Sequence, residues 1–204
     1  MSLLKRVAAT TIASLFVLAA EVAVAAVKVG DAAPNFSLAG ADGQTHSLAD
    51  YKGKTVVLEW TNADCPFVKK HYSGGNMQSL QKTYTGKDVV WLSIISSAPG
   101  KQGAVDAAGA TAIVKAKGAA PTQVLLDGKG DVGRLYEAKT TPHLFIIDKS
   151  GKLAYAGGID SEASADPADI ATATPYVKNA LDELLAGKPI TTSVTKPYGC
   201  SIKY

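Results

Sequence analysis

Nothing in this 204-residue sequence limits the fold more than a buried strand that leads directly to a cysteine at the start of a helix. The segment Thr55-Val-Val-Leu-Glu-Trp60 is rich in β-branched residues and almost entirely apolar, which is typical of a strand covered on both faces. A short polar turn separates it from Cys65-Pro66. Proline suits the first turn of a helix, where a backbone N–H has no partner. The combination predicts a layered fold in which Cys65 lies where a central strand gives way to a helix.

The rest of the chain favours an α/β fold. Residues 36–39 and 45–48 flank the turn-forming tetrad Gly40-Ala-Asp-Gly43, which predicts an N-terminal β-hairpin. Further buried strands are expected at 89–95, 124–127, 143–148 and 153–156, and helices at 66–84 (interrupted at Gly74-Gly75), 103–117, 131–136 and 170–185. This order predicts a central mixed β-sheet with helices on both faces.

The N-terminus has the pattern of a signal peptide. Lys5 and Arg6 precede an apolar run from Val7 to Ala20, and Ala23-Val-Ala25 offers a cleavage site with small residues. An uncleaved membrane anchor is the alternative, but the run is shorter than the roughly 20 apolar residues that span a bilayer. We therefore expect a periplasmic or secreted protein that meets a membrane only through an uncleaved leader. Its expected parts are a signal peptide (1–25), a domain (28–186) and a C-terminal tail (187–204).

The charge of the chain argues against nucleic-acid binding. The formal net charge is +3, which falls to about +2 when Lys5, Arg6 and Glu21 leave with the leader. The sequence has only two arginines, Arg6 and Arg134. So small a charge does not attract a polyanion, and no nucleic acid is expected as a partner.

Two cysteines, Cys65 and Cys200, are expected in an oxidising compartment. A thiol of ordinary pKa, about 8.5, is mostly protonated at neutral pH, and the field at a helix start favours the thiolate. Lys69 would assist ionisation of Cys65, and Asp64 would oppose it unless its carboxylate caps the helix. Cys65 is thus a candidate catalytic nucleophile and Cys200 a candidate resolving cysteine. The same pair could instead form a structural disulfide.

Residues beside the turn complete the candidate site. We expect Trp60 and Asn62 to contribute to substrate binding, although core packing for Trp60 and turn formation for Asn62 are plainer alternatives. His143 could approach Cys65 as a base. His71 and Met77 have no second cluster at metal-ligand spacing, so neither a metal nor another cofactor is expected.

Several segments resemble the thioredoxin-fold superfamily. The strand before Cys65, the helix start at Pro66 and Thr140-Thr-Pro-His143 ahead of another buried strand have its arrangement. Within it, Gly30-Asp-Ala-Ala-Pro-Asn-Phe36 and Phe145-Ile-Ile-Asp148 resemble the redoxin branch, which holds the AhpC/TSA-type peroxiredoxins and the TlpA-like reductases. The resemblance covers roughly residues 28–186 and implies a thioredoxin-like fold.

The resemblance also implies roles for particular residues. In thioredoxin-like proteins a Cys-x-x-Cys pair opens the helix beside a cis-proline. Cys65 matches the first cysteine, whereas Val68 takes the place of the second. Pro142 matches the cis-proline, and Thr141 before it would offer its backbone to a substrate strand. Ordinary Cys-x-x-Cys cycling is therefore excluded.

The peroxiredoxin pattern is incomplete. Leu58 and Asn62 stand where those enzymes carry a proline and a threonine, so proficient peroxide reduction is not expected. A closer resemblance is to a peroxiredoxin-like family with one cysteine in Asp-Cys-Pro-Phe-Val-Lys-Lys-His-Tyr and a Tyr-Gly-Cys-Ser-Ile-Lys-Tyr end. Both strings are present, at 64–72 and 198–204.

These features predict an exported thiol oxidoreductase that carries out thiol–disulfide exchange or peroxide reduction through Cys65. Its partner would be a thiol/disulfide redox protein or a small-molecule thiol. The alternative is a non-catalytic binding module of the same fold, stapled by a Cys65–Cys200 disulfide.

Overall fold

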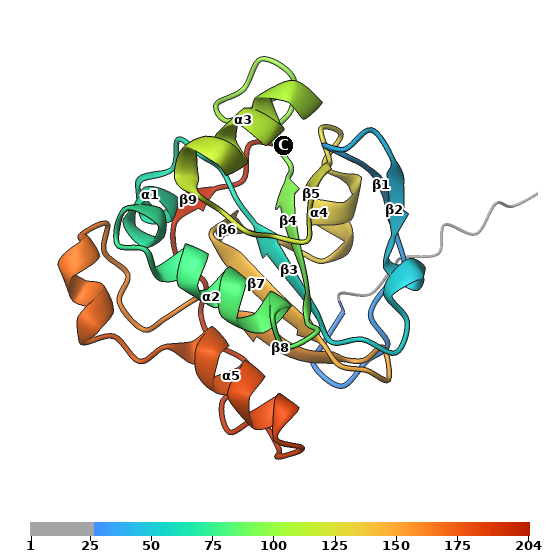
Figure 1. Ribbon diagram of the computed structural model, residues 1–204, viewed down its shortest axis with the longest axis vertical. Helices are drawn as coiled ribbons and strands as arrows, with labels where there is room; N and C mark the ends of the chain where they lie inside the picture. Colours follow the sequence, from blue (N-terminus) through green and yellow to red (C-terminus); the bar gives the residue numbers. More distant parts are fainter. Residues whose placement is uncertain (1–26) are drawn as a thin grey trace, which may run out of the picture.

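The computed structural model describes residues 27–204, and the predicted signal peptide lies outside the described residues. The main sheet has seven strands in the order β2-β1-β5-β4-β3-β7-β8 (Figure 1). Its strands are β1 (Ser37–Gly40), β2 (Thr45–Ser47), β3 (Val56–Trp60), β4 (Val90–Ile95), β5 (Gln123–Leu126), β7 (His143–Ile147) and β8 (Leu153–Gly157). A separate two-stranded sheet pairs β6 (Thr140–Thr141) with β9 (Cys200–Ser201).

The helices follow the strands as the apolar pattern predicts. The α-helices are α1 (Pro66–Ser73), α2 (Asn76–Thr85), α3 (Ala107–Lys117), α4 (Asp131–Leu135) and α5 (Tyr176–Leu185), and the 3-10 helices are η1 (Leu48–Tyr51) and η2 (Pro167–Ala171). Gly75, with a positive φ of 70°, separates α1 from α2 at the predicted interruption.

The sheet is mixed, as predicted. Strands β3, β4 and β5 are parallel, whereas β7 runs antiparallel to β3 and pairs with β8 in a hairpin. β1 and β2 form the predicted N-terminal hairpin, which joins the sheet through β5. β3 is therefore central, and its carboxyl end brings the chain to Cys65.

Alternate residues of the central strands supply two apolar layers. Leu58 and Phe145 pack with Val132 of α4 on one face. Val57 and Ile146 pack with α2 and α5 on the other face, which α3 also covers through Ala110. Each large apolar side chain that is fully buried stabilises the fold by roughly 1.5–3 kcal/mol. Helices on both faces of the sheet confirm the predicted α/β class.

Two helix boundaries differ from the prediction. The helix expected over 103–117 begins only at Ala107, because the Asp106 carboxylate caps it by accepting a hydrogen bond from the Gly109 N–H (2.8 Å). The helix expected over 170–185 is divided into η2 and α5. Pro175 causes the division, since the residue before a proline is disfavoured in the helical region.

Candidate active site

Cys65 is the residue immediately before α1, and its side chain is completely buried. After β3 ends at Trp60, Asn62 folds the chain into a turn. Its side-chain oxygen accepts a hydrogen bond from the Asp64 N–H (2.9 Å), and its main-chain oxygen accepts one from the Cys65 N–H (3.1 Å). Such local side-chain bonds are why asparagine favours turns. The predicted position of Cys65 at the helix start is therefore reproduced.

A cis-proline lies beside Cys65. The peptide bond between Thr141 and Pro142 is cis, and β6 ends there. The carbonyl oxygen of Thr141 accepts a hydrogen bond from the Cys65 thiol (3.0 Å). The hydroxyl of Thr141 is buried and has no hydrogen-bond partner among residues 27–204. The structure thus brings Cys65, Thr141 and Pro142 together, as the resemblance implied.

The C-terminal tail completes the site. β9 pairs antiparallel with β6, so that Cys200 lies opposite Thr141, and in Figure 1 the tail crosses the molecule beside β6. The Sγ atoms of Cys65 and Cys200 are 2.8 Å apart, and both cysteines are free. A disulfide bond would measure about 2.05 Å. The two sulfurs of the site are therefore in direct contact.

The surroundings distinguish the two sulfurs. Burial raises the pKa of Cys65. Donors that would stabilise its thiolate have a larger, opposite effect: the Cys200 thiol, the Thr141 hydroxyl and the amides of Val68 and Cys200. The net pKa of Cys65 therefore lies below its ordinary value. Burial and the contact with Cys65 raise the pKa of Cys200 to about 11. Cys65 is thus the sulfur that ionises, while Cys200 keeps its proton. Val68, in place of a second cysteine, contributes only its backbone.

Trp60 and Asn62 do not line an open surface. Trp60 has no exposed area, donates a hydrogen bond from its indole to the Ser96 hydroxyl (3.0 Å), and packs edge-on against Phe145. Both amide atoms of Asn62 are also engaged, because its Nδ2 donates to the Gln102 carbonyl (3.1 Å). In the described structure Trp60 therefore packs in the core below Cys65, and Asn62 forms the turn that leads to it. A contact of either residue with a substrate remains a prediction.

Other residues expected near the thiol lie elsewhere. The Nδ1 atom of His143 accepts a hydrogen bond from the Lys139 N–H (3.2 Å), and burial lowers the pKa of His143 to about 3. With its Nδ1 engaged and its pKa so low, His143 is too weak a base to take the proton of the Cys65 thiol. Lys69 is exposed, and it is Lys117 of α3 that reaches the turn, with its ammonium 3.5 Å from the Ala63 carbonyl oxygen.

Sequence reasoning missed a buried polar cluster that seats the tail. Tyr198 inserts its hydroxyl between His71 and Asp160, beside Lys70. These residues are far apart in sequence, so no local pattern connects them. The one signal was the presence of polar residues within segments that are otherwise apolar.

Residues 27–204 contain no group of three or more histidine, cysteine, aspartate or glutamate side chains that could hold a metal ion. No helix in this range combines the length and apolar character needed to cross a bilayer.

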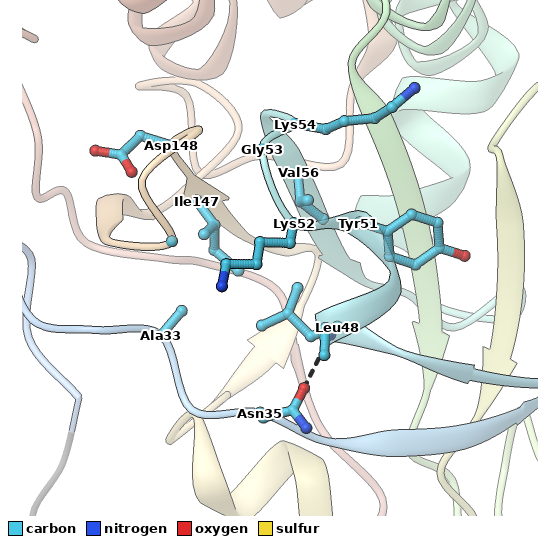
Figure 2. Close-up of a pocket in the computed structure, with 12 residues that line it drawn as sticks. Ala33, Asn35, Leu48, Tyr51, Lys52, Gly53, Lys54, Val56, Ile147 and Asp148 are labelled. Atoms are coloured by element: carbon cyan, nitrogen blue, oxygen red, sulfur yellow. Dashed lines mark hydrogen bonds between the residues drawn. The ribbon is translucent and has the colours of Figure 1, made fainter.

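A cavity of about 180 Å³ lies away from the two sulfurs. It is lined by Val56, at the opposite end of β3 from Cys65, with Leu48 and Ile147, and Asp148 stands at its side (Figure 2). None of the predicted site residues lines it. The chemistry of Cys65 therefore does not use this cavity.

The strand order, and the cysteine at a helix start beside a cis-proline, are those of the thioredoxin fold. The chain belongs to the AhpC/TSA family, whose model matches residues 29–156. This confirms the resemblance to the redoxin branch.

Individual relatives agree with this assignment. The thiol-disulfide oxidoreductase ResA of Geobacillus thermodenitrificans (strain NG80-2) is 28% identical over 130 residues, which cover 63% of this chain and 68% of ResA. The thioredoxin-like protein YneN of Bacillus subtilis (strain 168) is 30% identical over 125 residues, covering 61% of this chain and 68% of YneN. The crystal structure of an uncharacterized conserved protein from Geobacillus kaustophilus has a TM-score of 0.74 and 26% identity, and covers 87% of this chain and 92% of that one. The chain is therefore similar to thiol–disulfide oxidoreductases of the thioredoxin fold.

Proposed function

We propose that this protein is an exported thiol–disulfide oxidoreductase in which Cys65 is the nucleophile and Cys200 the resolving cysteine. The observation that carries the proposal is the 2.8 Å separation of the two sulfurs beside the cis peptide bond before Pro142. The lowered pKa of Cys65 and the raised pKa of Cys200 favour Cys65 as the sulfur that ionises first, as the proposed roles require. The similarity to a thiol-disulfide oxidoreductase supports the reaction class.

The reaction begins with the dithiol form. The Cys65 thiolate attacks one sulfur of a substrate disulfide, forms a mixed disulfide with it, and expels the second substrate sulfur as a thiolate that takes up a proton. Cys200 then loses its proton and attacks the Cys65 sulfur, which forms a Cys65–Cys200 disulfide and releases the first substrate sulfur as a thiol. Two electrons have passed to the substrate. A thiol/disulfide partner protein or a small-molecule thiol supplies two more to restore the dithiol.

Peroxide reduction is less well supported by the surroundings of Cys65. Among residues 27–204 the one arginine is Arg134, which stacks on the ring of Tyr204 (4.6 Å) and donates to the Lys129 carbonyl (2.7 Å). No guanidinium is thus directed at Cys65 to stabilise the charge that develops on a peroxide oxygen.

A non-catalytic binding module is the second candidate, and the complete burial of Cys65 is the observation that favours it. A Cys65–Cys200 bond would close a loop of 135 residues and stabilise the fold by about 5 kcal/mol in the loop-entropy model. In that case the disulfide would act as a staple rather than as a redox couple.

Exchange with a disulfide substrate tests the proposal. Reduced protein should reduce insulin disulfides; Cys65→Ser should abolish the activity, and Cys200→Ser should accumulate a mixed disulfide at Cys65. If hydrogen peroxide converts Cys65 to a sulfenate faster than any disulfide converts it to a mixed disulfide, the function is peroxide reduction instead. A Cys65–Cys200 bond that survives mild dithiothreitol without turnover would favour the staple.

Export is tested separately with the N-terminal segment. Residues 1–35 fused to a reporter that is active only outside the cytoplasm should give active reporter, cleaved near Ala25. Reporter retained inside the cell would contradict export and leave the thiol chemistry untouched.

A further inference from the structure

The tail pairs as an extended strand with β6, beside Cys65. We propose that the groove beside β6 accepts an extended protein segment with a tyrosine two residues before, and a glycine directly before, the half-cystine that Cys65 attacks. In the reduced protein, Tyr198-Gly-Cys200 of the tail fills this groove as a tethered substitute. The inference rests on the proposed thiol–disulfide exchange and names its substrate class.

The backbone contacts of the tail are those of an added strand. Thr140 pairs with Ser201 and Thr141 with Cys200. The flanking main chain is also bonded, since the Ile202 N–H donates to the Lys139 carbonyl (3.2 Å). Main-chain pairing of this kind recognises an extended segment, and side-chain pockets then select its sequence. Because Cys65 is completely buried, a protein substrate reaches it only when the tail leaves this edge.

The residue before the cysteine has no room for a side chain. Gly199 has a φ of 134°, in the region that favours glycine. A Cβ atom at this position would overlap the carbonyl oxygen of Thr141. A substrate segment in the same register meets the same obstacle, so glycine is required directly before its cysteine.

A buried polar site, here called the socket, is formed by Phe67, Lys70, His71 and Asp160 and binds the side chain of Tyr198, two residues before the cysteine. The hydroxyl of Tyr198 donates to the Asp160 carboxylate and lies 3.1 Å from Nε2 of His71. Its ring meets Phe67 edge-on (5.9 Å between centroids), and the Lys70 ammonium lies 5.6 Å from the ring centroid. Lys70, His71 and Asp160 are only 1%, 0% and 3% exposed.

The socket is held by the domain and not by the tail. Asn76 hydrogen-bonds Nδ1 of His71 (2.9 Å), and the Lys70 ammonium donates to the Glu162 carbonyl (2.8 Å). One oxygen of Asp160, Oδ2, is buried without a hydrogen-bond partner among residues 27–204. These groups keep their supports when the tail departs, so an incoming segment meets the same polar surface.

The chemistry of the socket favours tyrosine over phenylalanine. Burial lowers the pKa of His71 to about 4, so the imidazole is neutral at pH 7 and suits an uncharged hydroxyl. A ring without a hydroxyl would remove one of the two donors to Asp160 Oδ1 and leave only the Glu162 N–H (3.0 Å) for a buried carboxylate, whose Oδ2 already has no donor among residues 27–204. A site built to bind a hydroxyl discriminates strongly against an analogue that lacks one, because its own polar groups then lose their partner.

Peptide disulfides test the proposal on the full chain with Cys200→Ser. The probe is Lys-Pro-Tyr-Gly-Cys-Ser-Ile-Lys-Tyr with its cysteine joined to thionitrobenzoate. Attack by Cys65 forms the Cys65–peptide disulfide and releases thionitrobenzoate, which is followed by absorbance. This peptide should react about tenfold faster than peptides with phenylalanine or alanine in place of the first tyrosine.

Removing the tyrosine of the tail should act in the opposite direction. Tyr198→Ala in the Cys200→Ser chain vacates the socket and should speed the tyrosine peptide about tenfold. Asp160→Asn should weaken the preference for tyrosine over phenylalanine, whereas the control Asp131→Asn, at an exposed position on α4, should keep it.

The outcomes separate the inference from the proposed function. Equal rates for the three peptides, with no acceleration by Tyr198→Ala, would overturn the specificity and leave a reactive Cys65. If neither the peptides nor the symmetric disulfide of thionitrobenzoate reacts with Cys65, the proposed function itself fails. The comparison of peptides uses one protein, so it stands even where a socket variant does not fold.

Discussion

Cys200 lies opposite Thr141 in the β6–β9 pair, and this register brings its sulfur within 2.8 Å of the Cys65 sulfur. The second sulfur of the site therefore comes from the far end of the chain, 135 residues away, and not from the helix position that Val68 occupies. Under the proposed mechanism β9 has two roles, because the same strand supplies the resolving thiol and covers the edge of β6 where a substrate segment would pair.

The Thr141 hydroxyl should help to set the acidity of Cys65. It is buried and makes no hydrogen bond among residues 27–204, so it is free to donate one to the ionised sulfur, which lowers the pKa of Cys65. Thr141→Val keeps the shape of the side chain and removes the donor, so the pKa of Cys65 should rise. The pH dependence of alkylation by iodoacetamide measures it. Thr141→Ser should restore the value, and an unchanged pKa in Thr141→Val would contradict this role.

Expelling the tail should expose Cys65. In a Cys200→Ser chain, Gly199→Val forces a side chain against the Thr141 carbonyl, so β9 should separate from β6 and alkylation of Cys65 should become at least about tenfold faster. Gly187→Val is the matched control, because Gly187 also has a positive φ (69°) but has open space around its Cβ position. Equal rates in the two variants would show that the tail does not cover Cys65.

Acid should destabilise the protein through its buried histidine. The pKa of His71 is lowered to about 4 by burial, whereas an unfolded histidine titrates near 6.5. Between about pH 6.5 and pH 4 the unfolded chain therefore binds a proton that the folded protein does not. The free energy of unfolding should fall as the pH falls through this window, by roughly 1.4 kcal/mol per pH unit.

Urea unfolding at several pH values measures this dependence. His71→Gln, which does not titrate, should show a shallower slope than the unchanged protein. His143, whose pKa is lowered to about 3, still contributes with the same sign, so some slope should remain. The same slope in both proteins would rule out His71 as the group responsible.

Local signals account for the parts of the fold that could be predicted. The β-branched run of β3, the proline after Cys65 and the glycine pair after α1 each act over a few residues, and each appears where expected. The limits of the final helix were wrong because helical periodicity was extended through Pro175, where the local backbone effect of the proline prevails.

The site was less accessible to sequence reasoning because it depends on contacts between distant segments. β9 has only two residues and no apolar alternation, so no periodic pattern marks it as a strand. The contact of Tyr198 with His71 joins residues 127 positions apart. Trp60 also depends on distant contacts. Its position beside the turn left both a substrate contact and core packing open, and its packing against Phe145 and its hydrogen bond to Ser96 place it in the core.

The reduction potential of the Cys65–Cys200 couple tests the central claim most directly. Equilibrating the full chain with dithiothreitol or glutathione buffers, and counting free thiols by mass spectrometry, gives this potential. A redox couple that exchanges with substrates should lie between about −300 and −100 mV, the range of thiol–disulfide oxidoreductases, and Cys65→Ser should remove the transition. A potential well below about −300 mV would identify a structural staple and contradict the proposed chemistry.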